Sequence, residues 1–118
     1  MAIPSRVLAS GNAALATISI CGDGADALTA TGTTATDALQ LSAVYNTVAT
    51  AAASTGVKLP PTEAGAMVVV NNDGANTLTV YPATGSTIDG AASVSIATTK
   101  RRIFFGVTAT KWTSVLGA

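Results

Sequence analysis

The chain of 118 residues contains no histidine and one cysteine, Cys21. Without histidine, the commonest general base and a common metal ligand are missing, so Ser-His-Asp and Cys-His sites cannot form within one chain. A single cysteine forms neither an intramolecular disulfide nor a cysteine zinc cluster. The six acidic residues all stand beside Gly, Ala or Thr in predicted turns or loops. We therefore expect no enzyme activity, no cofactor and no metal site.

Charge is also scarce. Six Lys and Arg balance six Asp and Glu, and charged residues make up 10% of the chain, whereas a soluble domain usually carries about 25%. Zero net charge gives no general attraction to nucleic acid or to an anionic membrane. No apolar run approaches the roughly 20 residues that span a bilayer. A weakly charged surface favours assembly with protein partners.

Large apolar side chains are few as well. Ala, Thr, Gly and Ser occupy 63 of the 118 positions, a mixture that disfavours long amphipathic helices and favours turns and Thr-rich strands. A single small domain with so thin a core has little stability to spare. Oligomerisation would add buried surface.

The N-terminal residues show no clear periodicity up to residue 13. Residues before Cys21 lack the small side chains that a signal-peptide cleavage site needs, which disfavours a secretory signal. We expect residues 1–13 to form an extended arm that packs on a neighbouring molecule, and residues 14–118 to form a single β domain.

Strand spacing recurs along that domain. Apolar and polar residues alternate at residues 14–20, 39–43, 92–97 and 102–107, and shorter apolar segments lie at 27–30 and 56–59. Residues 44–53 fit a strand better than one or two helical turns, because Thr47 and Thr50 weaken a helix. Turns or loops are expected at residues 21–26, 31–37 and 98–101. This spacing predicts an all-β fold, a small antiparallel β-sandwich or barrel.

The strongest local pattern covers residues 66–81. Two apolar segments flank Asp73 and Gly74, a dipeptide that favours a two-residue hairpin turn. In that register Val69 faces Leu78, and both faces of the hairpin carry apolar residues. Phe104 falls on the face of its strand that should be polar, which suggests an interface residue.

Three weaker patterns have a functional and a structural interpretation. Asp23 and Asp26 can bind calcium with loop carbonyls, but their spacing does not match an EF-hand loop. The cluster at residues 100–102 is the main concentration of positive charge, and a solvated or salt-bridging turn explains it better than nucleic-acid binding. The aromatic side chains can stack on sugars, although core or interface positions are commoner. Asp73 and Asp89 precede glycines and are expected to cap their own turns.

The segments GVKLP at 56–60, GAMVVVNNDGANTLTVYP at 65–82, GSTIDG at 85–90 and Trp112 resemble motifs of small structural proteins in tailed bacteriophage virions. The resemblance covers residues 36–116. It implies a non-enzymatic virion component, commonly a homotrimer, on the capsid surface or in a tail or fibre. It implies no catalytic residues.

These observations together predict a capsid decoration or cement protein that binds the assembled shell as an oligomer. The expected partners are further copies of the chain and the major capsid protein or another virion protein. The alternative is a tail or fibre component that contacts glycans on the host surface. The candidate residues for subunit or capsid contact are Arg6, Val68, Val70, Tyr81, Phe104 and Trp112.

Overall fold

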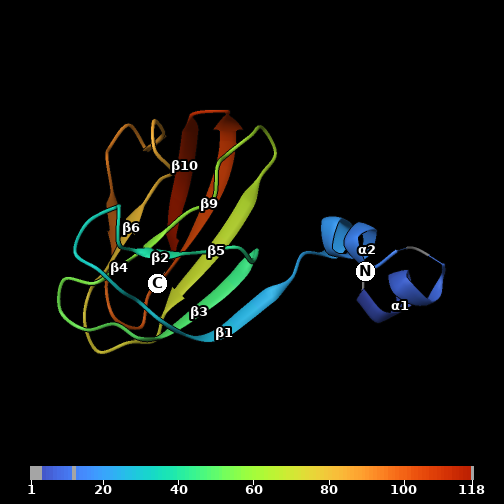
Figure 1. Cartoon of the computed structure of the whole chain (residues 1–118), viewed down its shortest axis with the longest axis horizontal. Helices are drawn as coiled ribbons and strands as arrows, with labels where there is room; N and C mark the ends of the chain where they lie inside the picture. The colour runs from blue at the N-terminus through green and yellow to red at the C-terminus, as the bar shows by residue number, and fades with distance from the viewer. Residues whose placement is uncertain (1–3, 12, 118) are drawn as a thin grey trace.

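A computed structural model describes residues 4–11 and 13–117 of the chain. Figure 1 shows a β body with two short helices beside it at the N-terminal end. The helices are α1 (Pro4–Ala9) and α2 (Ala14–Cys21). The strands are β1 (Gly24–Thr29), β2 (Leu39–Gln40), β3 (Tyr45–Thr50), β4 (Gly56–Lys58), β5 (Met67–Asn72), β6 (Leu78–Tyr81), β7 (Thr87–Ile88), β8 (Val94–Ile96), β9 (Arg101–Thr108) and β10 (Lys111–Gly117).

Successive strands from β1 to β6 alternate between two sheets. Sheet A has the strand order β1-β3-β5-β9-β10-β7, and sheet B has the order β2-β4-β6-β8. From β1 to β6, odd-numbered strands pair in parallel in sheet A and even-numbered strands pair in parallel in sheet B. This winding is a parallel β-solenoid of about four turns. The predicted antiparallel sandwich or barrel is therefore wrong. That prediction rested on alternation along the strands, which is the same in both folds and does not reveal which strands pair.

Antiparallel strands complete the C-terminal part of the solenoid. β8 pairs with β6 in sheet B, while β9 lies between β5 and β10 in sheet A. The turn between β9 and β10 falls at residues 109–110. The strands predicted at residues 44–53, 56–59 and 92–97 are confirmed by β3, β4 and β8. β1 begins at Gly24, inside the segment predicted as a turn.

The predicted hairpin at residues 66–81 is wrong. β5 belongs to sheet A and β6 to sheet B, so Val69 faces Tyr45 and Ile103 instead of Leu78. The corner is held by Asn72, whose buried side-chain amide donates hydrogen bonds to the carbonyls of Asn76 (2.9 Å) and Ile96 (2.8 Å).

Gly74 lies in the same corner, close to the preceding turn of the solenoid. A Cβ atom at this position would lie 2.6 Å from the backbone nitrogen of Ala51, so only glycine fits without a shift. Asp73 and Gly74 thus form a corner between two sheets instead of a two-residue hairpin turn.

The core lies between the two sheets. Sheet A contributes Val48, Val70 and Phe104, which are fully buried, and sheet B contributes residues of the same kind, namely Val57, Leu78, Val80 and Ile96. The expectation that Phe104 lies on an outward face is wrong. Side chains along a strand alternate between its two faces. Because Phe104 is buried between the sheets, its neighbours Ile103 and Phe105 face outward from β9.

The N-terminal segment contains two helices, which corrects two predictions. α1 occupies residues 4–9 of the extended arm expected at residues 1–13, of which residues 1–3 and 12 lie outside the described part, and α2 replaces the strand expected at residues 14–20. Ala and Leu are strong helix formers, and a proline suits the first turn of a helix. The alternation over residues 14–20 predicted a strand, but no strand of the described sheets pairs with this segment.

Candidate functional site

Exposed large apolar side chains are confined to two parts of the described chain. Those on the helices are Leu8 (49% exposed), Leu15 and Ile18. The others all belong to sheet A, on β3, β5, β9 and β10, and are Tyr45, Met67, Phe105, Val107, Val115 and Leu116. Among the described residues, sheet B exposes none of this kind. The apolar surface is thus concentrated in one helical segment and one sheet.

Strand register brings the residues of sheet A together. Tyr45 pairs with Val69, Val69 with Ile103, and Ile103 with Val115, so these residues form one continuous row across four strands. A second row places Met67 beside Phe105. Side chains that face each other across strands lie about 4.5–5.5 Å apart. We call the outward surface formed by these two rows the apolar face; its residues are Tyr45, Met67, Val69, Ile103, Phe105 and Val115.

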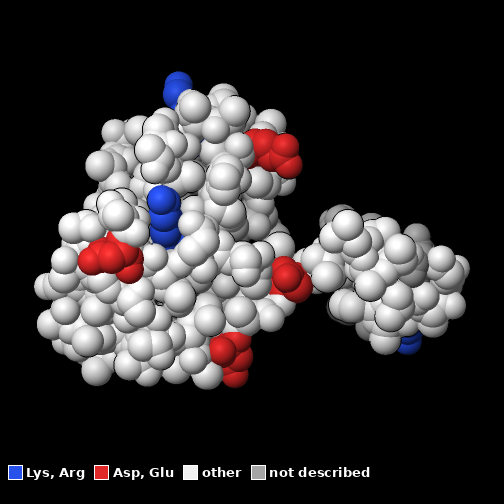
Figure 2. Space-filling model, in the orientation of Figure 1, with Lys and Arg blue, Asp and Glu red and all other residues white. Residues whose placement is uncertain are grey.

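Polar residues border the apolar face at one end. The next row joins Thr47 to Asn71 and Asn71 to Arg101. None of the residues of the apolar face itself is charged. On the side of the molecule seen in Figure 2, charged side chains are scattered, with no large cluster of one sign. A surface of this kind can bury apolar area against a partner without burying an unpaired charge.

α1 and α2 form a small helical hairpin, which we define as residues 4–21. The two helices contact each other, and in Figure 1 they stand to the side of the solenoid. Arg6 is the one charged residue in the sequence of this segment. Gly22 follows with a φ of 81°, in the left-handed region that favours glycine.

Asp23 fixes the point where the helical hairpin joins the solenoid. Its carboxylate Oδ1 accepts a hydrogen bond from the backbone N–H of Val44, and its carbonyl accepts one from the N–H of Tyr45, both at 2.9 Å. This residue therefore has a structural role that explains its position. Together with Asp26 it was considered for calcium, but the described residues contain no group of three or more Asp, Glu, His or Cys that could hold a metal ion.

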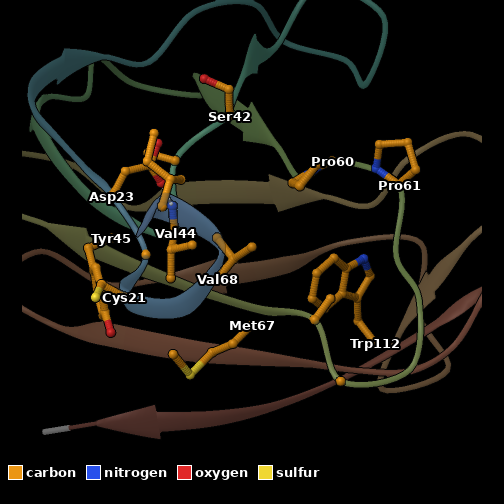
Figure 3. A pocket seen from close by; sticks show the side chains of 15 residues that line it. Cys21, Asp23, Ser42, Val44, Tyr45, Pro60, Pro61, Met67, Val68 and Trp112 are labelled. Carbon is orange, nitrogen blue, oxygen red and sulfur yellow. Dashed lines mark hydrogen bonds between the residues drawn. The ribbon is translucent and has the colours of Figure 1, made fainter. Parts of the chain in front are cut away.

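A pocket of about 480 Å³ lies where α2 meets the solenoid. Cys21, Tyr45, Met67 and Trp112 are among the residues that line it, as Figure 3 shows. Tyr45 and Met67 belong to the apolar face as well, so the pocket adjoins that face. The side chains around it offer no paired acid and base, and Asp23, the one carboxylate among them, is engaged by Val44. Most of the side chains that line the pocket are apolar.

A polar cluster that the sequence did not reveal joins the 85–90 loop to β10. Asp89 accepts hydrogen bonds from the backbone N–H (2.9 Å) and hydroxyl of Ser114, and Ser114 Oγ also accepts one from Arg102 Nε (3.0 Å). Partial burial tends to raise the pKa of the Asp89 carboxyl. The hydrogen bonds from Ser114 and Thr113 and the charge of Arg102 outweigh burial and hold this pKa below its ordinary value. Asp89 therefore fastens a loop to a strand and does not simply cap its own turn.

The predicted contact residues fall in different environments. Val68, Val70, Phe104 and Trp112 are at most 4% exposed and belong to the core, and Val68 and Trp112 also line the pocket. Arg6 is exposed on α1. Tyr81 is half-buried, and its hydroxyl donates a hydrogen bond to the carbonyl of Thr33 (3.1 Å).

The positive cluster at residues 100–102 is divided by the strand. Arg102 bonds Ser114, as described above, whereas Arg101 is exposed in the row that borders the apolar face. Arg101 thus lies within β9, like Arg102, instead of in the turn expected at residues 98–101, and Lys100 directly precedes the strand. Three adjacent charges supply little of the charge that phosphate binding needs.

The fold and these surfaces define a small β-solenoid with an apolar face and an apolar helical hairpin. No family model matches the chain, and neither a curated protein nor a solved structure shows significant similarity to it. None of the described helices is long and apolar enough to cross a membrane.

Proposed function

We propose that this protein is a structural component of a tailed-phage virion, a decoration or cement protein that binds the assembled head as an oligomer. The observation that carries the proposal is the confinement of exposed large apolar side chains, among the described residues, to sheet A and the helical hairpin. A chain with 10% charged residues and such surfaces is suited to permanent contacts between proteins. The link to a phage head rests on the resemblance of residues 36–116 to virion proteins.

The proposed mechanism needs no reaction. A decoration protein holds neighbouring capsomers together through buried area and hydrogen bonds, and a stable interface of this type buries more than about 1,000 Å². A homotrimer is the oligomer that the resemblance implies. It would multiply each contact with the shell and so slow dissociation.

The test is cosedimentation of the purified full-length chain with genome-free capsids that lack it. We expect the chain to pellet with the shells at a fixed ratio and to remain in the supernatant when shells are omitted. A chain that stays in the supernatant in both cases contradicts the proposal. A chain lacking residues 2–13 serves as a comparison, and we expect it to bind the shells less well, because it lacks α1.

The alternative role, contact with host glycans from a tail or fibre, has less support. Of the aromatic residues that could line a sugar-binding surface, Trp112 and Phe104 are buried in the core, and Tyr45 and Phe105 are exposed on the apolar face. Binding of the purified chain to a glycan array, unchanged by the presence of capsids, would favour this alternative over the head.

A further inference from the structure

The helical hairpin is too small to be stable without support. Its helices have six and eight residues, whereas isolated helices shorter than about 12–15 residues are marginal in water. Leu8 and Ile18 are 49% and 44% exposed, so the hairpin presents apolar surface to solvent. A segment of this kind gains stability only when another surface covers it.

The same chain carries a surface that lacks a cover. On the apolar face, Tyr45 and Val115 are 46% and 58% exposed, and Phe105 is 39% exposed. The half-buried Val69 and Ile103 lie between Tyr45 and Val115 in the same row of paired residues. A sheet with an exposed apolar side normally packs against another layer.

The sizes of the two surfaces agree. Four strands spaced by about 4.8 Å are roughly 19 Å wide, and two rows of residues extend about 13 Å along them. Two packed helices lie about 8–10 Å apart and are together roughly 20 Å wide. The eight residues of α2 give a length of about 12 Å at the usual helical rise. One helical hairpin therefore covers one apolar face.

The chemistry of the two surfaces agrees as well. The apolar face contains no charged residue, and the described helical hairpin contains only Arg6. Packing one against the other would therefore bury little or no charge, which would otherwise be costly. Asp23 is bonded to Val44 and Tyr45, which fixes the exit of the chain, and from there the helices extend away from their own solenoid in Figure 1.

We propose that the helical hairpin of one copy docks on the apolar face of a second copy. Each copy then gives one hairpin and receives one, so a closed assembly leaves neither surface exposed. One contact of the size above covers about 250 Å² on each side, and a reciprocal pair of contacts buries about 1,000 Å² in total, the lower bound for a stable interface. A ring of three copies closes by the same rule. This inference deepens the proposed function at the step of oligomer formation, and it does not require a shell.

The experiment uses two full-length variants, each of which damages one surface. Leu8→Asp places a charge on the helical hairpin and leaves the apolar face intact. Val115→Asp does the reverse. Both side chains are exposed, so neither change disturbs the solenoid core. Ser95→Asp, on the exposed outer side of sheet B, is the matched control for the added charge.

Mass is measured by sedimentation equilibrium for each variant alone and for an equimolar mixture. We expect each of the two variants alone to associate at least about tenfold more weakly than the unaltered chain, a loss of about 1.4 kcal/mol, whereas Ser95→Asp associates normally. The mixture should associate more tightly than either variant alone and more weakly than the unaltered chain. In a mixed pair one of the two contacts is undamaged, because the intact hairpin of Val115→Asp fits the intact face of Leu8→Asp.

Three results would overturn the exchange. An unaltered chain that is monomeric at every concentration would show that the hairpin has no partner copy. Normal association of either variant alone would show that its surface is not used. A mixture that associates no more tightly than either variant alone would show that the hairpin and the apolar face do not contact each other. Cosedimentation with capsids is a separate readout, so failure of the exchange and failure of the head assignment can be distinguished.

Discussion

At the scale of single residues, burial separates functional candidates from core positions. Phe104 and Phe105 are neighbours in β9, yet the first is fully buried and the second is 39% exposed. The sequence alone gives both the same chemistry, and only the position of the second sheet decides which of them faces the core. The same reason explains why Val68, Val70 and Trp112 were predicted as contacts and lie in the core instead.

Replacing Phe104 by alanine tests its position in the core. We expect Phe104→Ala to lower the free energy of unfolding by about 3–5 kcal/mol, because it leaves a cavity between the sheets. Val107→Ala, at a 52% exposed position of the same strand, should cost less than about 1 kcal/mol. Urea denaturation of the two variants measures both values. Equal losses would contradict the orientation of β9.

Asp89 predicts a specific dependence on pH. Its pKa in the folded chain lies below the ordinary value of 3.8, so the folded state prefers the ionised form. The stabilisation is therefore present above pH 3.8 and is lost as the pH falls through the lower pKa of the folded state. Asp89→Asn removes this titration.

The measurement for Asp89 is the melting temperature of both chains between about pH 7 and pH 2. We expect the melting temperature of the unaltered chain to fall more steeply with acid than that of Asp89→Asn. Parallel curves would show that the bonds to Ser114 do not favour the carboxylate.

At the scale of elements, most strands could be predicted and their partners could not. Alternation located β8 and β9, because burial on one side imposes a period of two on any strand. The partner of β5 depends on the corner at Asn72 and Gly74, where buried amide bonds and the contact with Ala51 direct the chain into the other sheet. These contacts join residues far apart in sequence, so the dipeptide Asp73-Gly74 by itself favoured the wrong turn.

A disulfide between neighbouring strands tests the parallel register of β3 and β5. Thr47 and Asn71 are partners in this ladder, at a separation that a disulfide can bridge. In a chain with Cys21→Ser, we expect Thr47→Cys with Asn71→Cys to form an intramolecular disulfide, visible as a shift in a non-reducing gel.

The matched control combines Thr47→Cys with Thr79→Cys, which lies in sheet B. Efficient cross-linking of this control, or none in the Thr47 and Asn71 pair, would contradict the solenoid.

At the scale of the whole molecule, the proposed assembly rests on the distribution of apolar surface. Composition predicted that the chain associates, since charge is scarce and the core is thin. It did not reveal the two surfaces, because their definition needs the strand register that joins Tyr45 to Val115 and the helices that replace the expected arm. Among the predicted interface residues, Val68, Val70, Phe104 and Trp112 lie on buried strand positions, and exposed positions next to them carry the surface.

The most direct test of this account is the mass of the full-length chain in solution, measured by light scattering over a range of concentrations. The account predicts a closed oligomer, with a mass of three times the chain mass of 11.5 kDa for the trimer that the resemblance implies. A reciprocal pair would give twice that chain mass and would keep the exchange of hairpins while correcting the copy number. A mass of 11.5 kDa at every concentration would contradict the central claim that this solenoid acts as an assembled structural protein.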